Sequence, residues 1–304
     1  MRIAVIGAGG IGGYYGALLV RQGEDVTFLL RGDTLDAVRH LGLTVESADG
    51  SFAVGPVVAT DDPTTIGPVD VVLHATKANG FRAALEHARP LIGPDTLVVT
   101  VQNGVGAPDV AAELVGAERV VPCIVRVFTQ VDRPGVIEHQ GGPGTLTIAK
   151  GDGAPSPILD AFRDALRRAG VTVIVPDDIW VDLWLKAMYV VPFGAAGGLT
   201  GDPIGVLRDP GVLRDALRAA ASEIAAVGRA RGVRLPADAV DATLAFTDTM
   251  PAEATASLQR DLLQRRPSEL DAQVGAICRL GDALGVPTPI HDLLYRALSA
   301  RGDD

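Results

Sequence analysis

The sequence predicts an α/β fold in which an N-terminal doubly wound parallel sheet is followed by an all-α C-terminal domain. Two observations support this prediction. Up to about residue 175, short apolar runs typical of buried strands alternate with helical segments. From residue 176 onward, apolar residues recur at close to 3.6-residue spacing and no convincing strand pattern remains. The predicted domains therefore span residues 1–175 and 176–304, a division that suits a chain of 304 residues.

The composition restricts the classes of partner. The net charge of -10 argues against a nucleic acid or an anionic membrane as the main partner, because phosphate binding requires a basic face. Cys123 and Cys278 lie far apart in apolar contexts, which is typical of reduced cysteines in a protein core. The five histidines lack the spacing of metal ligands, so we expect no metal site. No targeting or membrane-spanning segment is recognisable, and we expect a cytoplasmic protein.

The first thirty residues form a predicted βαβ unit. The apolar run of residues 3–7 leads into a glycine turn, a helix over residues 11–21 and a second apolar run over residues 25–30. The turn matches GxGxxG, whose glycines allow a tight turn, close approach of the backbone to a pyrophosphate, and close helix packing on the strand. The motif ends a strand and opens a helix, which favours a Rossmann-type dinucleotide-binding domain over a glycine-rich turn without a ligand. The candidate cofactor residues are Gly7, Gly9, Gly10, Ile11 and Gly12.

The end of the second predicted strand indicates which dinucleotide is bound. An NAD site usually has an acidic residue at this place, whereas the 2'-phosphate of NADP requires a cation. This sequence has Arg31 there, so we expect NADPH or NADP+. The alternative is that Arg31 lies on a solvated loop and that Asp33 serves NAD.

Two further apolar runs, VDVVLHATKA and TLVVTVQNG, end in polar residues that begin loops. Ligands of doubly wound sheets bind beyond the carboxyl ends of the strands, so Lys77 and Asn103 would both face the nicotinamide end of the cofactor. Each residue also has a structural alternative. Lys77 could be an exposed residue at a helix start, and Asn103 with Gly104 could be an ordinary turn pair.

After Val120 the pattern changes. The runs RVVPCIVRVFTQ, GVIEH and TLTIAK are separated by DRPG and GGPG, which predicts an antiparallel meander of three strands. A helix over residues 158–169 and a strand over residues 171–175 then complete the first domain.

The C-terminal domain has one unusual residue in its first helix. Helices are predicted near residues 178–198, 209–232, 236–247, 268–285 and 289–300, and Pro192 should kink or end the first of them. Lys186 lies in the middle of that helix, inside the otherwise uncharged run LWLKAMYVVPFG. The chain has only three lysines among its 27 basic residues. Because an ammonium can give up a proton where a guanidinium cannot, Lys186 is a candidate for proton transfer.

A second candidate lies in the stretch SLQRDLLQRRPSELDAQVGA. Ser257, Asp261 and Gln264 share one predicted helical stripe, and Glu269 falls at the start of the following helix. The alternative is structural: Ser268 would be the N-cap of that helix, and Glu269 would complement the helix dipole.

Taken together, these motifs resemble the ketopantoate reductase family over nearly the whole chain. That family reduces the ketone of 2-dehydropantoate to (R)-pantoate with NADPH, on the route to pantothenate and coenzyme A. The closing GVPTPIHDLLYRAL is also similar to the family. The other matching segments are GAGGIG at 7–12, TKA at 76–78, QNG at 102–104, RPGVIEHQGGPGTLTIAKG at 133–151, Trp184 with Lys186, and SLQRDLLQRRPSELDAQVG at 257–275.

The resemblance implies a role for each candidate. Lys186 would donate the proton to the carbonyl oxygen, and Glu269 would hold the substrate, orient Lys186 and contact the cofactor. Ser257 would bind the substrate carboxylate. Lys77 and Asn103 would bind near the nicotinamide and the reacting ketone. The glycine turn and Arg31 would hold the rest of the cofactor.

The sequence departs from the family at two positions beside the lysine. The best-known members have asparagine one turn and two turns after it, where this chain has Val190 and Gly194. Replacing a polar partner by an apolar side chain should shift preference toward less polar ketones. A reductase of another 2-oxo acid or ketone, a hydroxyacid dehydrogenase and a non-enzymatic NADPH sensor therefore stay open as alternatives. The alanine-rich helical half also suggests a homodimer.

Overall fold

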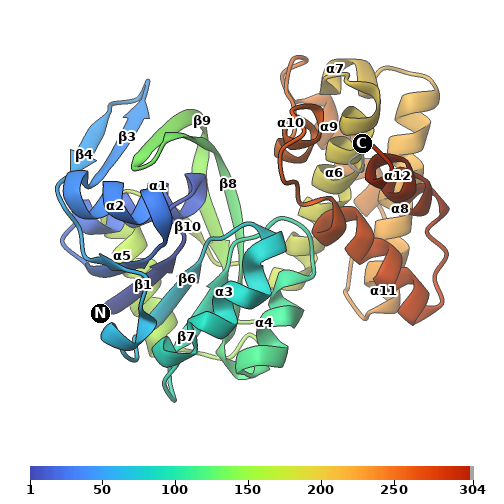
Figure 1. Cartoon of the computed structure of the whole chain (residues 1–304). Helices are drawn as coiled ribbons and strands as arrows, with labels where there is room; N and C mark the ends of the chain where they lie inside the picture. The colour runs from blue at the N-terminus through green and yellow to red at the C-terminus, as the bar shows by residue number, and fades with distance from the viewer. Residues whose placement is uncertain (302–304) are drawn as a thin grey trace. The chain divides into compact units, whose positions relative to one another are not determined.

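The computed structural model describes residues 1–301 and divides the chain into two compact units (Figure 1). The N-terminal unit contains Met1–Gln102 and Ala107–Ile179. The C-terminal unit contains Asn103–Gly106 and the chain from Trp180 onward. The first unit holds all the strands of the described residues and the second is helical, which confirms the predicted fold class.

The N-terminal unit is built on one mixed sheet with the order β4-β3-β9-β8-β7-β6-β1-β2-β5, and β10 pairs with β9. The six strands from β5 to β8 along this order pair in parallel. Numbered along the chain, their order is 3-2-1-4-5-6, the order of a doubly wound Rossmann sheet. The strands are β1 Arg2–Ile6, β2 Asp25–Leu29, β3 Leu43–Ser47, β4 Phe52–Val54, β5 Ala59–Thr60, β6 Val71–His74, β7 Leu97–Thr100, β8 Val120–Arg133, β9 Val136–Ile148 and β10 Thr172–Ile174.

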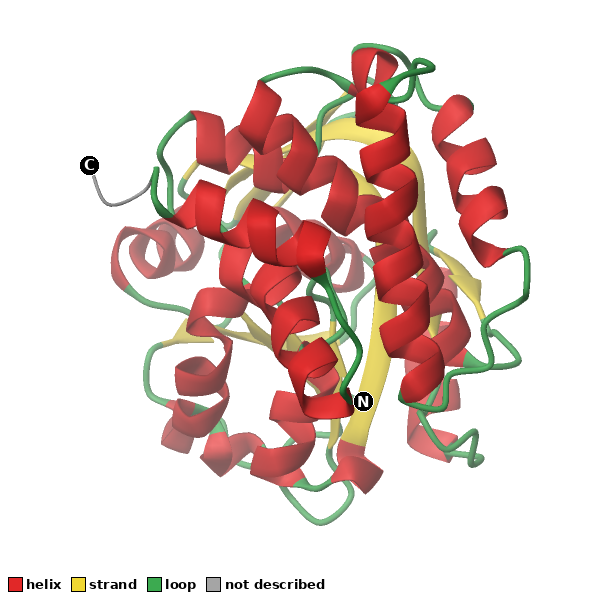
Figure 2. Ribbon diagram, turned by 90° about the vertical axis from the view of Figure 1, so that its right-hand side faces the viewer, coloured by secondary structure: helices red, strands yellow, loops and turns green. Residues whose placement is uncertain are grey.

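Helices cover both faces of the parallel strands (Figures 1 and 2). Successive side chains of a strand point to opposite faces. In β1, Ile3 and Val5 share a core with α1 (Gly10–Arg21), α2 (Gly32–Leu41) and α5 (Pro157–Arg168). The alternate residues Ala4 and Ile6 share a second core with α3 (Phe81–His87) and α4 (Ala107–Val115). Four short 3-10 helices complete the unit: η1 Pro63–Thr65, η2 Ala78–Gly80, η3 Arg89–Leu91 and η4 Ala117–Arg119.

The predicted three-stranded meander is wrong. The structure has two long antiparallel strands, β8 and β9, and the GGPG segment lies inside β9. Gly141, Gly142 and Gly144 adopt positive φ values of 115°, 89° and 60°, and the pairing register shifts opposite them, around Phe128. The glycines therefore bend the strand as a bulge instead of reversing the chain.

The described residues of the C-terminal unit form helices joined by loops, without a strand (Figure 2). Its main helix, α6, runs from Ile179 to Thr200 and passes through Pro192, so the expected termination at the proline does not occur. Val191 and Ala195 are fully buried beside the proline, and their packing outweighs one missing backbone hydrogen bond. The other elements are α7 Ile204–Leu207, α8 Val212–Ala230, α9 Ala239–Asp248, α10 Ser257–Leu263, the π-helical turn η5 Asp271–Gly275, α11 Ala276–Leu284 and α12 Pro289–Ser299.

By length and composition alone, α6 could cross a membrane, but 56% of its apolar window is buried inside the structure. Trp184 and Val191 on this helix are 1% and 0% exposed. A core helix of a water-exposed fold has the same properties. We therefore treat α6 as the central helix of its unit.

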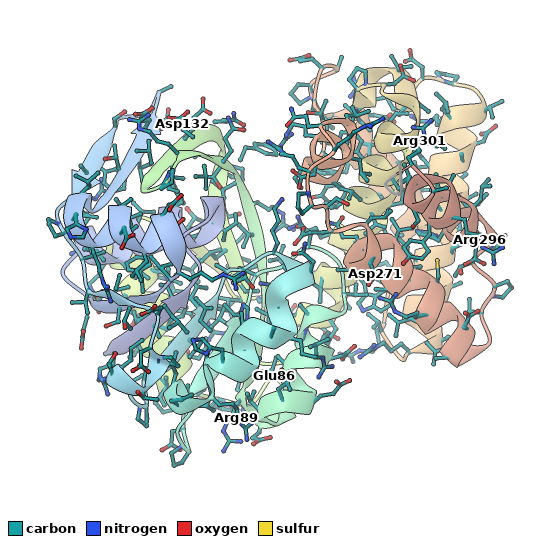
Figure 3. All side chains as sticks on the ribbon, viewed as in Figure 1. Glu86, Arg89, Asp132, Asp271, Arg296 and Arg301 are labelled. Carbon is teal, nitrogen blue, oxygen red and sulfur yellow. The ribbon has the colours of Figure 1, made fainter. Side chains whose placement is uncertain are left out.

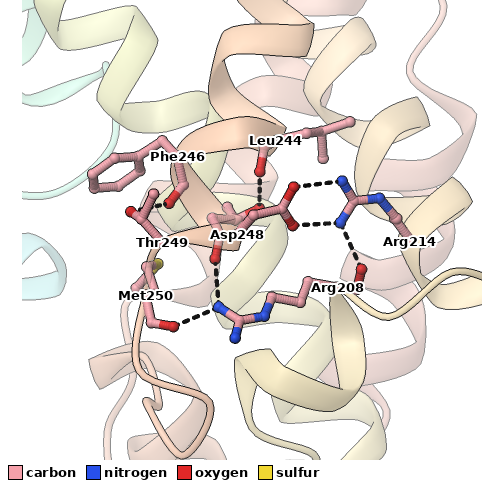
Figure 4. Close-up of polar contacts among 8 residues, drawn as sticks. Arg208, Arg214, Leu244, Phe246, Asp248, Thr249 and Met250 are labelled. Atoms are coloured by element: carbon pink, nitrogen blue, oxygen red, sulfur yellow. Dashed lines mark hydrogen bonds and ion pairs between the residues drawn. The ribbon is translucent and has the colours of Figure 1, made fainter.

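Polar contacts hold the ends of α7, α8 and α9 together (Figure 4). The two terminal guanidinium nitrogens of Arg214 donate to the Asp248 carboxylate, at 2.6 and 2.8 Å, and this pairing lowers the pKa of Asp248. Arg208 donates to the carbonyl oxygens of Thr247, at 2.9 Å, and Met250. Arginine thus satisfies the free carbonyls at the C-terminal end of α9, which fixes that helix against α7 and α8.

Candidate functional site

The glycine turn between β1 and α1 is shaped by contacts that tolerate no side chain. Gly7 has a φ of 88°, in the region that favours glycine. A Cβ on Gly12 would lie 2.0 Å from the carbonyl oxygen of Gly7 and 2.8 Å from Ala75 Cβ. A Cβ on Gly10 would lie 2.8 Å from Thr129 Oγ1, and Ile11 packs against the core. Gly12 therefore keeps α1 in close contact with the turn and with the chain that follows β6.

Gly9 differs from its neighbours because no atom lies within 4 Å of the position that its Cβ would take. It is the N-cap of α1, and no side chain caps this helix. The first N–H groups of this twelve-residue helix therefore have no side-chain cap, and the space at Gly9 would let a ligand approach the positive end of the helix dipole. These features fit the pyrophosphate of a dinucleotide.

Arg31 lies two residues beyond the last residue of β2, where it is the N-cap of α2 in extended conformation. Its side chain is exposed and makes no hydrogen bond or ion pair with another described residue. A guanidinium in this setting is available to an anionic ligand. Asp33 lies in the first turn of α2.

The ends of β6 and β7 are tied together by Gln102, a residue for which the sequence suggested no separate role. His74 and Thr100, the last residues of β6 and β7, are paired in the sheet register. Lys77 and Asn103 each lie three residues beyond these paired strand ends. The buried amide of Gln102 donates to the carbonyl oxygens of His74, at 2.8 Å, and Thr76, at 2.9 Å. Lys77 is exposed at the N-terminus of η2. Gln102 therefore fixes the strand end from which Lys77 projects.

The buried imidazole of His74 predicts a pH-dependent stability of the N-terminal unit. His74 is 0% exposed, stacks on Phe81 at 4.1 Å and bonds the Phe81 carbonyl oxygen through Nε2. Burial lowers the pKa of His74 to about 4. In the unfolded chain a histidine titrates near ~6.5, so the unfolded state takes up the proton first as the pH falls. The stabilisation is present above pH ~6.5 and is lost as the pH falls toward ~4.

We expect the substitution His74→Gln, which keeps a donor for Phe81, to remove this dependence. Between pH ~7 and pH ~4.5, the free energy of unfolding should fall by about 2 kcal/mol less in the variant than in the unchanged chain. Urea denaturation at the two pH values measures the difference. Equal losses in both proteins would contradict it.

In the C-terminal unit, the structure brings Lys186 and Asn103 together. The Lys186 ammonium donates a hydrogen bond of 2.8 Å to Asn103 Oδ1. Lys186 itself is half-buried on α6, among the buried residues Trp184, Ala187 and Met188. The amide oxygen of Asn103 therefore orients the Lys186 ammonium, which projects from an otherwise apolar surface of α6.

The Asn103 loop is held by the π-helical turn η5. Gly104 has a φ of 89°, and a Cβ there would lie 3.1 Å from the carbonyl oxygen of Ala272. The loop therefore approaches the backbone of η5 too closely for a larger residue. Turns of π-helix occur often at functional sites.

Glu269 is half-buried and directly precedes the helical residue Leu270. Its backbone carbonyl oxygen accepts from the Gln273 N–H at 2.9 Å, and its Oε2 accepts from Gln273 Nε2 at 3.2 Å. The Ser268 hydroxyl makes no capping bond to the helix within the described residues, so the alternative N-cap prediction is wrong.

Another carboxylate of this segment, Asp271, which is labelled in Figure 3, has a structural role. Its Oδ1 accepts from Arg279, at 2.7 Å, and from the Tyr295 hydroxyl, at 2.6 Å. The hydrogen bond from Arg279 is the main cause of a lowered pKa for Asp271. Asp271 thus ties η5 to α11 and α12.

The segment before Glu269 is fixed by the C-terminal end of α10. Arg265 adopts a positive φ of 51°, and the Arg266 N–H donates to the Asp261 carbonyl oxygen at 2.9 Å, which is a Schellman motif. The Arg266 side chain also bonds the buried Asp261 carboxylate at 2.9 Å. Asp261 therefore anchors a chain reversal, whereas Ser257 is exposed at the start of α10.

Val190 and Gly194 follow Lys186 by one and two turns of α6. A Cβ on Gly194 would lie 3.0 Å from Leu258 Cβ and 3.2 Å from Leu258 Cδ2. Gly194 therefore allows α10 to pack closely on α6, and a longer side chain would require Leu258 to move. This face of α6 is apolar beyond the lysine, because it carries half-buried Val190 and is covered by Leu258.

These features define a Rossmann-type oxidoreductase with a second, helical unit that carries a lysine paired with an asparagine. Residues 3–153 match the family model "Ketopantoate reductase PanE/ApbA", and residues 178–302 match its C-terminal counterpart. The chain belongs to the ketopantoate reductase family.

Individual relatives agree with this assignment. A 2-dehydropantoate 2-reductase of Mesorhizobium japonicum is 32% identical and covers 96% of this chain and 95% of its own. The crystal structure of 2-dehydropantoate 2-reductase from Geobacter metallireducens has a TM-score of 0.89 and 32% identity, and covers 99% of each chain. D-mandelate dehydrogenase with NADH and anilino(oxo)acetate shares the fold, with a TM-score of 0.87 at 22% identity over 100% of this chain and 99% of its own.

Proposed function

We propose that this protein is an NADPH-dependent reductase of a 2-oxo acid, with 2-dehydropantoate as the favoured substrate and (R)-pantoate as the product. The observation that carries the proposal is the 2.8 Å hydrogen bond between Lys186 and Asn103 on an otherwise apolar helix face. Relatives of at least 30% identity over nearly the full chain bear the name 2-dehydropantoate 2-reductase.

In this mechanism Lys186 is the proton donor. When bound, NADPH supplies the hydride that adds to the ketone carbon. Negative charge then develops on the carbonyl oxygen, and a fixed ammonium can stabilise that charge and donate the proton. Asn103 would hold the ammonium in place, since its Oδ1 accepts a hydrogen bond from Lys186.

Other residues of the chain hold the substrate and the cofactor. Glu269 would orient the substrate and Lys186, and the exposed Ser257 hydroxyl would bind the substrate carboxylate. Gly7, Gly9 and Gly12 would receive the pyrophosphate. Lys77 would bind toward the nicotinamide.

Arg31 is proposed to select NADPH over NADH, because it is an exposed guanidinium without a described partner at the end of β2. We expect Arg31→Ala to raise the KM for NADPH by ~10-fold or more, the value of one charge-assisted hydrogen bond, and to leave the KM for NADH nearly unchanged. Steady-state kinetics with both cofactors measure the two KM values. An equal change for both would show that Arg31 does not contact the 2'-phosphate.

A second candidate substrate class is favoured by one observation. The face of α6 beyond Lys186 carries Val190 and is covered by Leu258. Neither side chain can hydrogen-bond a substrate hydroxyl, so a 2-oxo acid or ketone with an apolar substituent would fit this surface. The reaction and the role of Lys186 would be the same.

An assay of NADPH oxidation, followed by absorbance, tests the proposal. The panel contains 2-dehydropantoate, 2-oxo acids with branched apolar or aromatic side chains, and neutral ketones. The highest kcat/KM on 2-dehydropantoate is the expected result. Preference for apolar 2-oxo acids would support the second substrate class, and activity only on neutral ketones would exclude a carboxylate-binding role for Ser257. NADPH binding without turnover on any compound would favour a sensor.

A further inference from the structure

Gln273 is a buried polar residue beside the proposed site, and neither the motifs nor the resemblance assigned it a role. It lies in the π-helical turn η5 and is 1% exposed. A buried amide costs free energy unless both its nitrogen and its oxygen find partners. The partners of Gln273 therefore indicate why a polar side chain occupies this position.

Gln273 donates two hydrogen bonds within the described residues, and both go to Glu269. The backbone N–H donates to the Glu269 carbonyl oxygen at 2.9 Å, and Nε2 donates to Glu269 Oε2 at 3.2 Å. An ionised carboxylate only accepts hydrogen bonds, so the amide nitrogen must face it and the amide oxygen must point away. That oxygen, Oε1, is buried and has no hydrogen-bond partner among the described residues.

The Asn103 loop passes close to Gln273. A methyl group added at Gly104 would come within 3.6 Å of Gln273 Cα and 3.7 Å of Gln273 Cγ. Gly104 directly follows Asn103, whose Oδ1 accepts from Lys186. One side chain therefore bonds Glu269 and lies close to the loop that bonds Lys186.

We propose that Gln273 is a positioning residue that fixes the Glu269 carboxylate and the Asn103 loop in one arrangement for ketone reduction. The proposal rests on the proposed function. An apolar residue of similar length would fill the same space without leaving a buried oxygen unpaired, so packing alone does not explain the amide. Natural proteins commonly retain such unfavourable groups where activity requires them.

The first variant is Gln273→Met, which keeps the length and removes the hydrogen bond to Glu269. We expect kcat to fall about 10-fold, as for the loss of one hydrogen bond to a charged group, while the thermal unfolding midpoint stays within ~2 °C of the unchanged chain. The matched control is Gln140→Met. Gln140 also donates to a glutamate, Glu138, at 3.2 Å, but it is exposed in the N-terminal unit, and its loss should not change kcat.

The second variant is Gln273→Glu, which places two carboxyl groups at hydrogen-bond distance. Such a pair shares one proton, and the pKa of one member rises. At high pH the two charges repel and activity should be low. As the pH falls through the raised pKa, the introduced carboxyl becomes a donor to Glu269, and kcat relative to the unchanged chain should recover. Gln273→Met should show no such recovery.

The outcomes separate this role from the proposed function. An unchanged chain that reduces no compound of the panel overturns the proposed function and this role with it. An active unchanged chain with wild-type kcat in Gln273→Met overturns the role of Gln273 alone. If Gln273→Met does not fold, the pH profile of Gln273→Glu decides: recovery at low pH supports positioning, and a profile parallel to that of the unchanged chain overturns it.

Discussion

Replacing Lys186 with alanine should lower kcat for ketone reduction by at least ~100-fold, the lower range for the loss of a general acid. The variant lacks both the proposed proton donor and the charge that would stabilise the developing oxyanion. NADPH affinity should stay nearly constant, because the glycine turn and Arg31 belong to the N-terminal unit and are unaltered. Steady-state kinetics give kcat, and a fluorescence titration gives the Kd for NADPH.

Two control variants make the Lys186 result specific. Lys186→Arg keeps the positive charge but not a readily transferred proton, so kcat should also be low. Lys150→Ala removes another of the three lysines, a half-buried one that forms an ion pair of 3.4 Å with the exposed Asp152, and kcat should be unchanged. Near wild-type turnover in Lys186→Ala would remove Lys186 from the mechanism.

Replacing Gly9 with alanine should weaken NADPH binding by at least ~10-fold without destabilising the protein. The added methyl group meets no protein atom within 4 Å, and the φ of -70° suits any residue. The methyl group would instead occupy the space beside the uncapped end of α1, where a pyrophosphate must approach the backbone. Isothermal titration gives the Kd, and thermal unfolding shows that the fold is retained.

Gly12→Ala provides the contrasting variant. Its added methyl group would lie 2.0 Å from the Gly7 carbonyl oxygen, so the strand and the helix must separate. We expect a loss of stability of about 3 kcal/mol, at the upper end for overpacking, together with the loss of NADPH binding. Unchanged NADPH affinity in Gly9→Ala would show that the cofactor does not bind at this turn.

The sequence predicted those parts of the fold that depend on local pattern. The βαβ unit and the helical C-terminal half follow from apolar periodicity, which records which face of each element is buried. The prediction of a turn at the GGPG segment is wrong because glycine and proline occur in β-bulges as well as in turns. The continuation of α6 through Pro192 depends on burial by other helices, which no local pattern contains.

The sequence motifs supply candidate residues for the site, but they do not show which of these residues lie together. Lys186 and Asn103 are separated by 83 positions, and only the fold brings them into hydrogen-bond distance. Gln102 belongs to the QNG motif, yet its bonds to His74 and Thr76 depend on the alignment of two strand ends. Gly194 stood out as a missing asparagine, whereas the structure gives it a packing role against Leu258.

The division of the chain between Gln102 and Asn103 has a consequence for protein engineering. Two adjacent residues belong to different units, since Gln102 braces the end of the sheet and Asn103 bonds the lysine of the helical unit. A chimera that took only the residues from Trp180 onward from a relative would combine the Asn103 loop of this chain with the lysine-bearing helix of the relative. To transplant the chemistry of a relative intact, an exchange must also carry the four residues Asn103–Gly106, although they lie in the first half of the sequence.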